Sequence, residues 1–310
     1  MIVATPPMNT IRPLLRPLPL AGISGLFLAA TLSTTTTKSI SRMASSSSPQ
    51  QWPVKQYTPR HSSWPYNPSD FTRQDSSPDT SFYSVPRFVT HIDDAAIETL
   101  KQYYDSVLPK KGKILDFCSS WISHYPESIE AAASQGELKV IGMGMVKAEL
   151  EKNAVLNSGR LLQDLNENPD LNSALVENGC VPADEESKID ASTNVVSTDY
   201  LTQPVQVLTS LREATKRGGT VHLTISNRCF PTKAISRWLR VPEEERVEMV
   251  GDFLHFAGWK KIEIVELSNG TVSEDEVASS GSARGNLQGL MSMLGMNRRD
   301  PLWVVRAMKE

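Results

Sequence analysis

Residues 113–142 read KILDFCSSWISHYPESIEAAASQGELKVIG, and their pattern already indicates a class of fold. Residues 113–117 (KILDF) form a short apolar run that predicts a buried strand. Residues 126–133 are suited to a short helix, and residues 138–142 (LKVIG) predict a second strand. A strand, a helix and a second strand in this order are typical of a parallel sheet.

The same alternation continues along the chain. Helices are predicted at residues 91–108, 146–153, 203–216 and 242–258, and further strands at residues 160–164, 190–196, 220–226, 261–266 and 302–307. Thr202 is interpreted as the N-cap of the helix at residues 203–216, and Gly218-Gly219 as its end. Residues 166–188 are polar and acidic and predict a loop with one helical turn. We therefore expect an α/β fold with a mostly parallel sheet and helices on both faces.

The charge of the chain is divided between two segments of opposite sign. Residues 1–69 contain six Lys and Arg and no Asp or Glu. The whole chain has 32 Lys and Arg against 35 Asp and Glu, so residues 70–310 hold 26 basic and 35 acidic residues, a net charge of −9. This segment lacks the excess of basic residues typical of nucleic-acid binding, which argues against nucleic acid as the main partner. Three scattered cysteines indicate a reducing compartment rather than a disulfide framework.

Residues 1–50 have the composition of an organelle transit peptide, because they are basic, rich in Ser and Thr, and free of acidic residues. We expect this segment to be disordered and to direct the protein to a mitochondrion or plastid. Residues 18–32 are apolar but shorter than the ~20 residues that a membrane span needs, so no stable span is expected. Two alternatives stay open: an extension without a targeting role, and a translation start at Met43, which would leave the protein in the cytoplasm.

Residues 51–85 are rich in proline and aromatic residues. The rings belong to Trp52, Trp64, Tyr66, Phe71, Phe82 and Tyr83. We interpret this segment as an extended arm that packs its rings on a domain of residues 86–310. Within that domain, residues 268–300 are rich in Gly and Ser and carry three methionines near their end. They are interpreted as a flexible insertion or as a lid over an apolar substrate.

Polar and small residues gather directly after the first five predicted strands. These segments are residues 116–124 (DFCSSWISH), 142–145 (GMGM), 163–166 (QDLN), 194–200 (NVVSTDY) and 226–233 (SNRCFPTK). In a sheet of this class, ligands bind outside the carboxyl ends of the strands, where the strand order reverses. Small residues there allow the close backbone approach that a nucleotide-like ligand needs. The sequence therefore predicts a ligand site at this edge of the sheet.

The same blocks, in this order, resemble the class I S-adenosylmethionine-dependent methyltransferases, and more closely the methyltransferase type 11 group. The blocks read ILDFCSSWISHYP, GMGM followed by ELEKN, QDLN, DASTNVVSTDYL and SNRCFPTKAI, and the resemblance covers residues 64–308. It implies a Rossmann-like sheet of seven strands whose last strand is antiparallel. It also implies S-adenosyl-L-methionine as cofactor and methyl transfer to an acceptor, for which a small molecule is favoured over a macromolecule.

The resemblance assigns cofactor contacts to four of these blocks. The implied contacts are Asp116, Cys118, Ser119 and Ser120 under the methionine moiety, Gly142, Met143, Gly144 and Met145 beside the ribose and adenine, Asp164 and Leu165 at the adenine, and Asn194, Val195 and Ser197 beside the transferred methyl group. A simpler interpretation as turn or capping residues is also open for six of them: Asp116, Ser119, Ser120, Gly142, Gly144 and Asp164. Together these residues define an expected cofactor site across strands one to four.

Two features depart from the family pattern. The turn after Asp116 contains no glycine, although the family's turn is glycine-rich. The acidic residue that usually ends strand two is missing: Met143 stands about there, and Glu149 follows a turn and a half later. These departures support a second hypothesis, a catalytically inactive methyltransferase-like binding or assembly protein of an organelle.

Five residues after strands one, four and five are candidates for the substrate side: His124, Asp199, Tyr200, Asn227 and Arg228. His124 is as consistent with a structural role as with a catalytic one. Asp199 and Tyr200 are suited either to accept a proton or to cap and pack the next helix. Arg228 is suited to bind an anionic group of a substrate or to pair with an acidic neighbour. No general base stands out, and the dispersed histidines predict no metal site.

Overall fold

The computed structural model describes residues 52–182, 184–271 and 299–310. All of them belong to one unit, Ser48–Glu310. The predicted transit segment and most of the predicted insertion at residues 268–300 lie outside these ranges. Within the described ranges, no helix combines the length and the apolar character that crossing a membrane requires.

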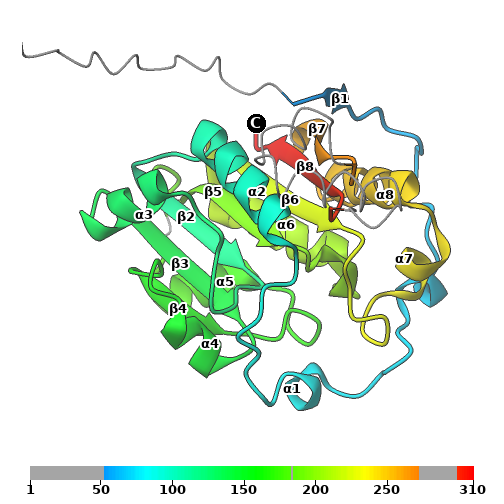
Figure 1. Cartoon of the computed structure of the whole chain (residues 1–310), viewed down its shortest axis with the longest axis horizontal. Helices are drawn as coiled ribbons and strands as arrows, with labels where there is room; N and C mark the ends of the chain where they lie inside the picture. Colours follow the sequence, from blue (N-terminus) through cyan, green and yellow to red (C-terminus); the bar gives the residue numbers. More distant parts are fainter. Residues whose placement is uncertain (1–51, 183, 272–298) are drawn as a thin grey trace, which may run out of the picture. The chain divides into compact units, whose positions relative to one another are not determined.

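An eight-stranded sheet forms the centre of the described structure, in the order β1-β7-β8-β6-β5-β2-β3-β4 (Figure 1). Its strands are β1 (Val54–Gln56), β2 (Gly112–Phe117), β3 (Leu138–Gly144), β4 (Gly159–Leu162), β5 (Ile189–Val195), β6 (Thr215–Ser226), β7 (Lys260–Ser268) and β8 (Leu302–Met308). Neighbouring strands from β4 to β6 pair in parallel, whereas β8 runs antiparallel to both β6 and β7. The predicted α/β class, with a mostly parallel sheet and a reversed last strand, is confirmed.

The sheet has one strand more than the seven that were predicted. Val54–Gln56 pairs antiparallel with β7, with Val54 opposite Val265. Just before this strand, Glu266 N donates to Pro53 O at 3.0 Å. All three residues of β1 are exposed, and no alternation of apolar and polar residues marked them as a strand. The arm therefore begins as an edge strand of the sheet.

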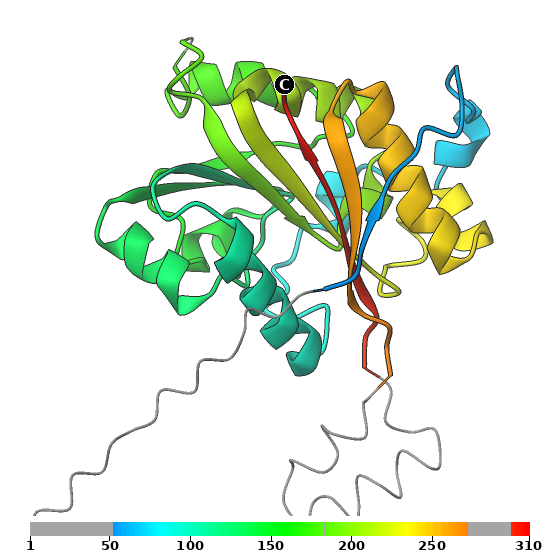
Figure 2. The ribbon, with the colours of Figure 1, turned by 90° about the horizontal axis from the view of Figure 1, so that it is seen from above.

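Helices cover both faces of the sheet (Figure 2). They are α1 (Asp79–Phe82), α2 (Asp94–Val107), α3 (Glu127–Ser134), α4 (Lys147–Lys152), α5 (Leu171–Glu177), α6 (Pro204–Ala214), α7 (Ser236–Arg240) and α8 (Glu243–Phe256), with 3₁₀ turns η1 (Pro68–Phe71) and η2 (Thr198–Tyr200). Buried residues of α2, α3 and α4 join one core, and those of α5, α6 and α8 join the other.

Strand β2 shows why KILDF forms a central strand. Its buried side chains alternate, because Ile114 joins the core of α2 and α3, whereas Leu115 and Phe117 join the core of α5, α6 and α8. A strand that is covered on both faces reads as a continuous apolar run. Asp116 interrupts this run at the carboxyl end, where the neighbouring strands β3 and β5 also end.

The boundary of α6 differs from the prediction. The proposal that Gly218-Gly219 stop this helix is wrong, because α6 ends at Ala214 and both glycines lie inside the long strand β6. Thr202 does not cap α6 either, since its hydroxyl donates to Asn166 Oδ1 at 3.0 Å. The Thr202 hydroxyl binds a distant loop instead of the helix N-terminus. A local sequence pattern does not show which of the two partners a side chain takes.

Aromatic rings hold the arm against α8. Trp64 stacks with Phe71, at 5.8 Å between ring centroids, and meets Phe256 edge-on at 5.4 Å. The Tyr66 hydroxyl donates to Asp252, a fully buried carboxylate of α8. Buried carboxylates need such partners, so this hydrogen bond fixes the path of the arm as well as satisfying the charge.

Candidate functional site

A cavity of about 350 Å³ lies at the edge of the sheet where β2, β3, β4 and β5 end. Two sets of residues form most of its wall. The strand-end wall comprises the cavity-lining residues of segments 116–124, 143–149, 163–166 and 195–201, which follow these four strands. The arm wall comprises the cavity-lining residues of segment 79–92, which runs from α1 towards α2.

Most of the site residues predicted from the sequence line this cavity. They are Asp116, Cys118, Ser119, Ser120, Met143, Gly144, Met145, Asp164, Leu165, Val195 and Ser197 of the cofactor set, and His124, Tyr200 and Arg228 of the substrate-side set. The parallel strands bring these separate segments together at one edge, as expected for the carboxyl ends of such a sheet. Gly142, Asn194, Asp199 and Asn227 are not among the lining residues.

The residues outside the wall have other positions. A Cβ at Gly142 would lie 2.3 Å from Leu156 Cδ1, so this glycine faces the core. Asn194 is fully buried, and its Nδ2 donates to Phe117 O at 3.1 Å, which ties β5 to the end of β2. Asn227 is exposed to solvent. The sequence places these residues near the site but does not fix the direction of their side chains.

Asp199 lies behind the wall. It is buried, and its Oδ2 has no hydrogen-bond partner among the residues that the structure describes. Burial raises the pKa of this carboxyl to about 8, so the side chain is protonated at neutral pH. A protonated acid outside the cavity does not act as a proton acceptor facing a substrate. The neighbouring Tyr200 does line the cavity, and its hydroxyl accepts a hydrogen bond from Phe230 N at 2.8 Å.

Asp116 holds the loop that follows β2. Its Oδ2 accepts hydrogen bonds from the Ser119 hydroxyl at 2.6 Å and the Ser123 hydroxyl at 2.7 Å, and its Oδ1 accepts one from the Thr193 hydroxyl at 3.3 Å. Burial raises the pKa of this carboxyl to about 6, against the opposing effect of these hydrogen bonds. Because the protein already engages both oxygens, Asp116 shapes the cavity rather than offering a free acceptor.

Cys118 takes the conformation in which a glycine would be less strained. It stands where the family's first glycine follows the acidic residue, and its φ is 54°, in the left-handed region. For a residue with a Cβ this conformation costs about 1 kcal/mol. Removal of water from the thiol raises its pKa to about 12, so the thiolate needed for nucleophilic attack does not form at neutral pH.

Two backbones approach each other closely at the end of β3. Ser119 N donates to Met143 O at 2.7 Å, so the loop after β2 rests on the end of β3. A Cβ at Gly144 would lie 2.2 Å from Ser119 O. A side chain at position 144 therefore fits only if this loop moves.

An acidic group reaches the cavity from α4 instead. Glu149 is 7% exposed, and its Oε2 accepts a hydrogen bond from the Ser120 hydroxyl at 2.7 Å. Its Oε1 accepts one from Arg87 N at 2.6 Å, which links the strand-end wall to the arm wall. The carboxylate lines the cavity, where it can accept hydrogen bonds from hydroxyl groups of a ligand.

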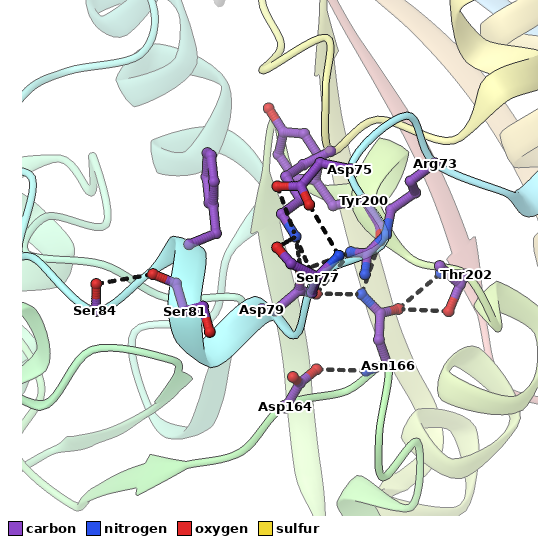
Figure 3. A network of polar contacts seen from close by, with 12 residues as sticks. Arg73, Asp75, Ser77, Asp79, Ser81, Ser84, Asp164, Asn166, Tyr200 and Thr202 are labelled. Carbon is purple, nitrogen blue, oxygen red and sulfur yellow. Dashed lines mark hydrogen bonds and ion pairs between the residues drawn. The ribbon is translucent and has the colours of Figure 1, made fainter.

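Two ion pairs and a hydrogen bond from Asn166 of the strand-end wall hold Asp79 of the arm wall in place (Figure 3). Arg73 Nη1 donates to both oxygens of Asp79, at 2.7 and 2.8 Å, and Asn166 Nδ2 donates to Asp79 Oδ2 at 2.8 Å. The fully buried Lys233 pairs with Asp79 at 3.2 Å and with Asp75 at 3.3 Å. Burial raises the pKa of Asp79, but these partners outweigh it and hold the pKa below its ordinary value. The carboxylate is therefore charged and anchors α1.

The adenine-side candidates are held by a local turn. Asp164 Oδ1 accepts a hydrogen bond from Asn166 N at 2.9 Å, and its Oδ2 has no partner among the described residues. Leu165 is buried beside it and lines the same cavity. One free carboxylate oxygen next to an apolar side chain fits a ring that carries an amino group.

His124 lies in the strand-end wall with no hydrogen bond to its ring from any described residue. It is 6% exposed, and its Nδ1 is buried without a partner. Burial lowers the pKa of the imidazole to about 4, so the ring is neutral at pH 7. No group of His, Cys, Asp and Glu in the described ranges has the arrangement of a metal site.

The arm wall was not predicted from the sequence. Tyr83, Arg87 and His91 line the cavity, although no motif marks any of them. The one signal was the proline and aromatic composition of residues 51–85, which predicted packing on the domain but no part in a ligand site. The contacts of Lys233, some 150 residues away in sequence, decide where this segment lies.

No family model and no curated protein matches the sequence. Among solved structures, the chain is similar to Haemonchus contortus phosphoethanolamine N-methyltransferase 2 in complex with S-adenosyl-L-methionine, at 15% identity and a TM-score of 0.40. That match covers 68% of this chain and 52% of the H. contortus chain, so the chain spans about half the length of that enzyme.

Two further matches cover more of the other chain. A methyltransferase dependent on S-adenosylmethionine from Archaeoglobus fulgidus matches at 12% identity and a TM-score of 0.41, over 69% of this chain and 94% of that one. One from Mesorhizobium loti matches at 12% identity and a TM-score of 0.38, over 67% and 96%. Identities this low and TM-scores below 0.5 establish neither a family nor an activity; the chain is similar in structure to S-adenosylmethionine-dependent methyltransferases.

Proposed function

We propose that the protein is an S-adenosylmethionine-dependent methyltransferase that acts on a small-molecule acceptor. The observation that carries the proposal is a cavity whose strand-end wall is built from the four segments that resemble the family's cofactor-binding segments. The left-handed Cys118 supports it, because the loop after β2 makes the kind of turn that the family makes with glycine.

The residues of the strand-end wall fit the parts of this cofactor. Asp164 and Leu165 offer a carboxylate oxygen and an apolar surface to the adenine. Glu149 and Ser120 offer polar atoms to the ribose hydroxyls, in the absence of the acidic residue that usually ends the family's second strand. Val195 and Ser197 line the cavity at the end of β5, where the resemblance assigns the transferred methyl group.

When bound, S-adenosylmethionine supplies a methyl group on a sulfonium whose leaving group is a neutral thioether. The protein therefore needs mainly to hold the acceptor in line and to exclude water. The arm wall is suited to this task, because Tyr83, Arg87 and His91 line the cavity from a segment that follows none of the four strands. A base is required only for an acceptor that must lose a proton, and none is assigned.

Calorimetric titration of the full chain with S-adenosylmethionine and S-adenosylhomocysteine tests the proposal. Asp164→Asn keeps the oxygen that accepts from Asn166 N but removes the charge, so we expect its affinity for both compounds to fall about tenfold. Glu167→Gln is the matched control, because Glu167 is exposed and outside the cavity. Absence of binding to the unmodified chain at millimolar ligand would contradict the proposal.

One observation favours a second candidate, a methyltransferase-like binding or assembly protein without activity. The acidic residue that usually binds the ribose in the family is missing, and Met143, a buried apolar residue, stands about there. This candidate predicts no heat of binding for either compound in the same titration. For localisation, we propose a mitochondrion or plastid; a fluorescent fusion of residues 1–50 that stays in the cytosol would overturn it.

A further inference from the structure

Arg228, the cation that the sequence suggests for anion binding, is already paired. Arg228 Nε donates to Asp300 Oδ1 at 2.6 Å, and the Arg228 side chain is 61% exposed. A guanidinium with a carboxylate partner and open access to water offers little to a ligand. If the cavity binds an anion, another cation of the cavity wall must therefore form the contact.

Arg87 of the arm wall is such a cation. Its guanidinium lies 4.5 Å from the centre of the Phe82 ring and 5.5 Å from that of Phe230. No carboxylate of the described residues forms an ion pair with it: Glu149 accepts only from the backbone N–H of Arg87. Nη2 donates to Phe82 O at 3.1 Å, and Nη1 is buried without any acceptor in the described structure. The charge thus faces aromatic rings and a cavity, with donors left over.

Two more donors without partners line the same cavity. The Tyr83 hydroxyl and the His91 ring make no hydrogen bond with any described residue, although both side chains lie in the arm wall beside Arg87. Burial lowers the pKa of His91, so its neutral ring offers one N–H at pH 7. The two carboxylates on this side are already engaged: each oxygen of Glu149 accepts one hydrogen bond, from Ser120 and from Arg87 N, and Asp79 pairs with Arg73 and Lys233. The donors of Arg87 Nη1, Tyr83 and His91 therefore stay without partners among the described residues at this place.

We propose that the arm wall forms an anion subsite, centred on the Arg87 guanidinium with Tyr83 and His91 beside it, that binds a carboxylate or phosphate group. The planar guanidinium matches two oxygens of either group, and the two neutral donors add hydrogen bonds to the rest. A cationic ligand would be repelled here, and an apolar one would leave the donors unsatisfied. Assigning the anionic group to the methyl acceptor rests on the proposed function; the subsite itself does not.

Calorimetric titration of the full chain with inorganic phosphate tests the subsite, with chloride at equal ionic strength as the reference. We expect saturable binding that is at least tenfold weaker in Arg87→Met and unchanged in Arg228→Met, the matched control from the same cavity. Tyr83→Phe removes only a hydroxyl and should weaken binding severalfold with no loss of folding. The proposal would be overturned if the unmodified chain showed no saturable binding. It would also be overturned if Arg87→Met and Tyr83→Phe both bound phosphate as tightly as the unmodified chain.

A second titration identifies the source of the anionic group. S-adenosylhomocysteine carries a carboxylate, whereas 5′-methylthioadenosine has the same nucleoside without it. If Arg87→Met weakens phosphate binding but leaves the affinity for both nucleosides unchanged, the subsite belongs to the acceptor, which then carries the carboxylate or phosphate. If it weakens only S-adenosylhomocysteine, the subsite holds the cofactor's carboxylate. Failure of both nucleosides to bind the unmodified chain would refute the proposed function, while the phosphate titration still decides the subsite.

Discussion

The two walls of the cavity are built in different ways. The strand-end wall follows from local sequence, because each of its segments begins where a buried strand ends. The arm wall follows from distant contacts, above all the buried Lys233 that holds Asp79 and Asp75. The comparison indicates that the scaffold sets the strand-end wall, whereas one ionic cluster sets the arm wall. Each wall should therefore fail separately when its own support is removed.

The largest effect is expected where the arm wall loses its anchor. Lys233→Met removes a fully buried cation and leaves Asp79 with less compensation, so we expect the free energy of unfolding to fall by about 3 kcal/mol. Urea denaturation measures this loss. Lys111→Met is the control, because the Lys111–Glu137 pair is exposed and its removal should cost less than about 1 kcal/mol. Equal losses in the two variants would refute the anchoring role.

The strand-end wall is broken most directly at Gly144. Gly144→Ala places a Cβ 2.2 Å from Ser119 O unless the loop moves, so we expect a loss of about 2 kcal/mol in stability. Binding of S-adenosylhomocysteine should weaken as well. Gly136→Ala is the comparison, because Gly136 has a positive φ but open space and lies outside the cavity. It should lose stability without losing affinity; retained affinity in Gly144→Ala would contradict the loop contact.

The pH dependence of stability should reveal the titration of Asp199, the buried acid outside the cavity. The pKa of Asp199 is about 8 in the folded protein, above the unfolded value of about 3.9, so the folded state binds more protons between these values. Its contribution to stability is therefore complete below about pH 4 and is lost as the pH rises through 8. Between pH 6.5 and 8.0 the loss is on the order of 1 to 2 kcal/mol.

Asp199→Asn should remove this part of the pH dependence, as measured by urea denaturation across the range. Asp105→Asn is the control, because Asp105 is exposed and hydrogen bonds from Lys110 and Ser128 lower its pKa. That variant should keep the wild-type slope above pH 6.5. An unchanged slope in Asp199→Asn would show that Asp199 does not titrate in this range.

The smallest effect is expected at the turn after β2. Cys118→Gly relieves about 1 kcal/mol of left-handed strain but increases the freedom of the unfolded chain by a similar amount, so stability should change by less than about 0.5 kcal/mol. Cys118→Val places a β-branched residue at the same φ and should lose more. Thermal unfolding of both variants checks the order, and a Val variant as stable as the Gly variant would contradict it.

The sequence predicts one part of the molecule much better than the other. The strands from KILDF to LWVVRA could be located because burial on both faces makes continuous apolar runs, and the position of the site then followed from parallel topology. The exposed strand Val54–Gln56 has no such pattern, and its place is set by pairing with β7.

The direction of side chains could not be predicted from the sequence either. Asn194 lies near the end of β5 and Asp199 follows the strand, yet both are buried outside the wall, because hydrogen bonds and packing decide where each points. The arm wall could not be predicted at all, since Arg87 acquires its place through contacts with Phe82, Phe230 and Glu149. Such contacts leave no periodic trace in the sequence.

Hydrogen exchange of the full chain, with and without saturating S-adenosylhomocysteine, tests most directly the claim that the strand-end wall binds the cofactor. The account predicts slower exchange at the amides of residues 117–124, 143–149 and 163–166 in the presence of the ligand. Protection confined to other segments, or none at millimolar S-adenosylhomocysteine, would contradict it.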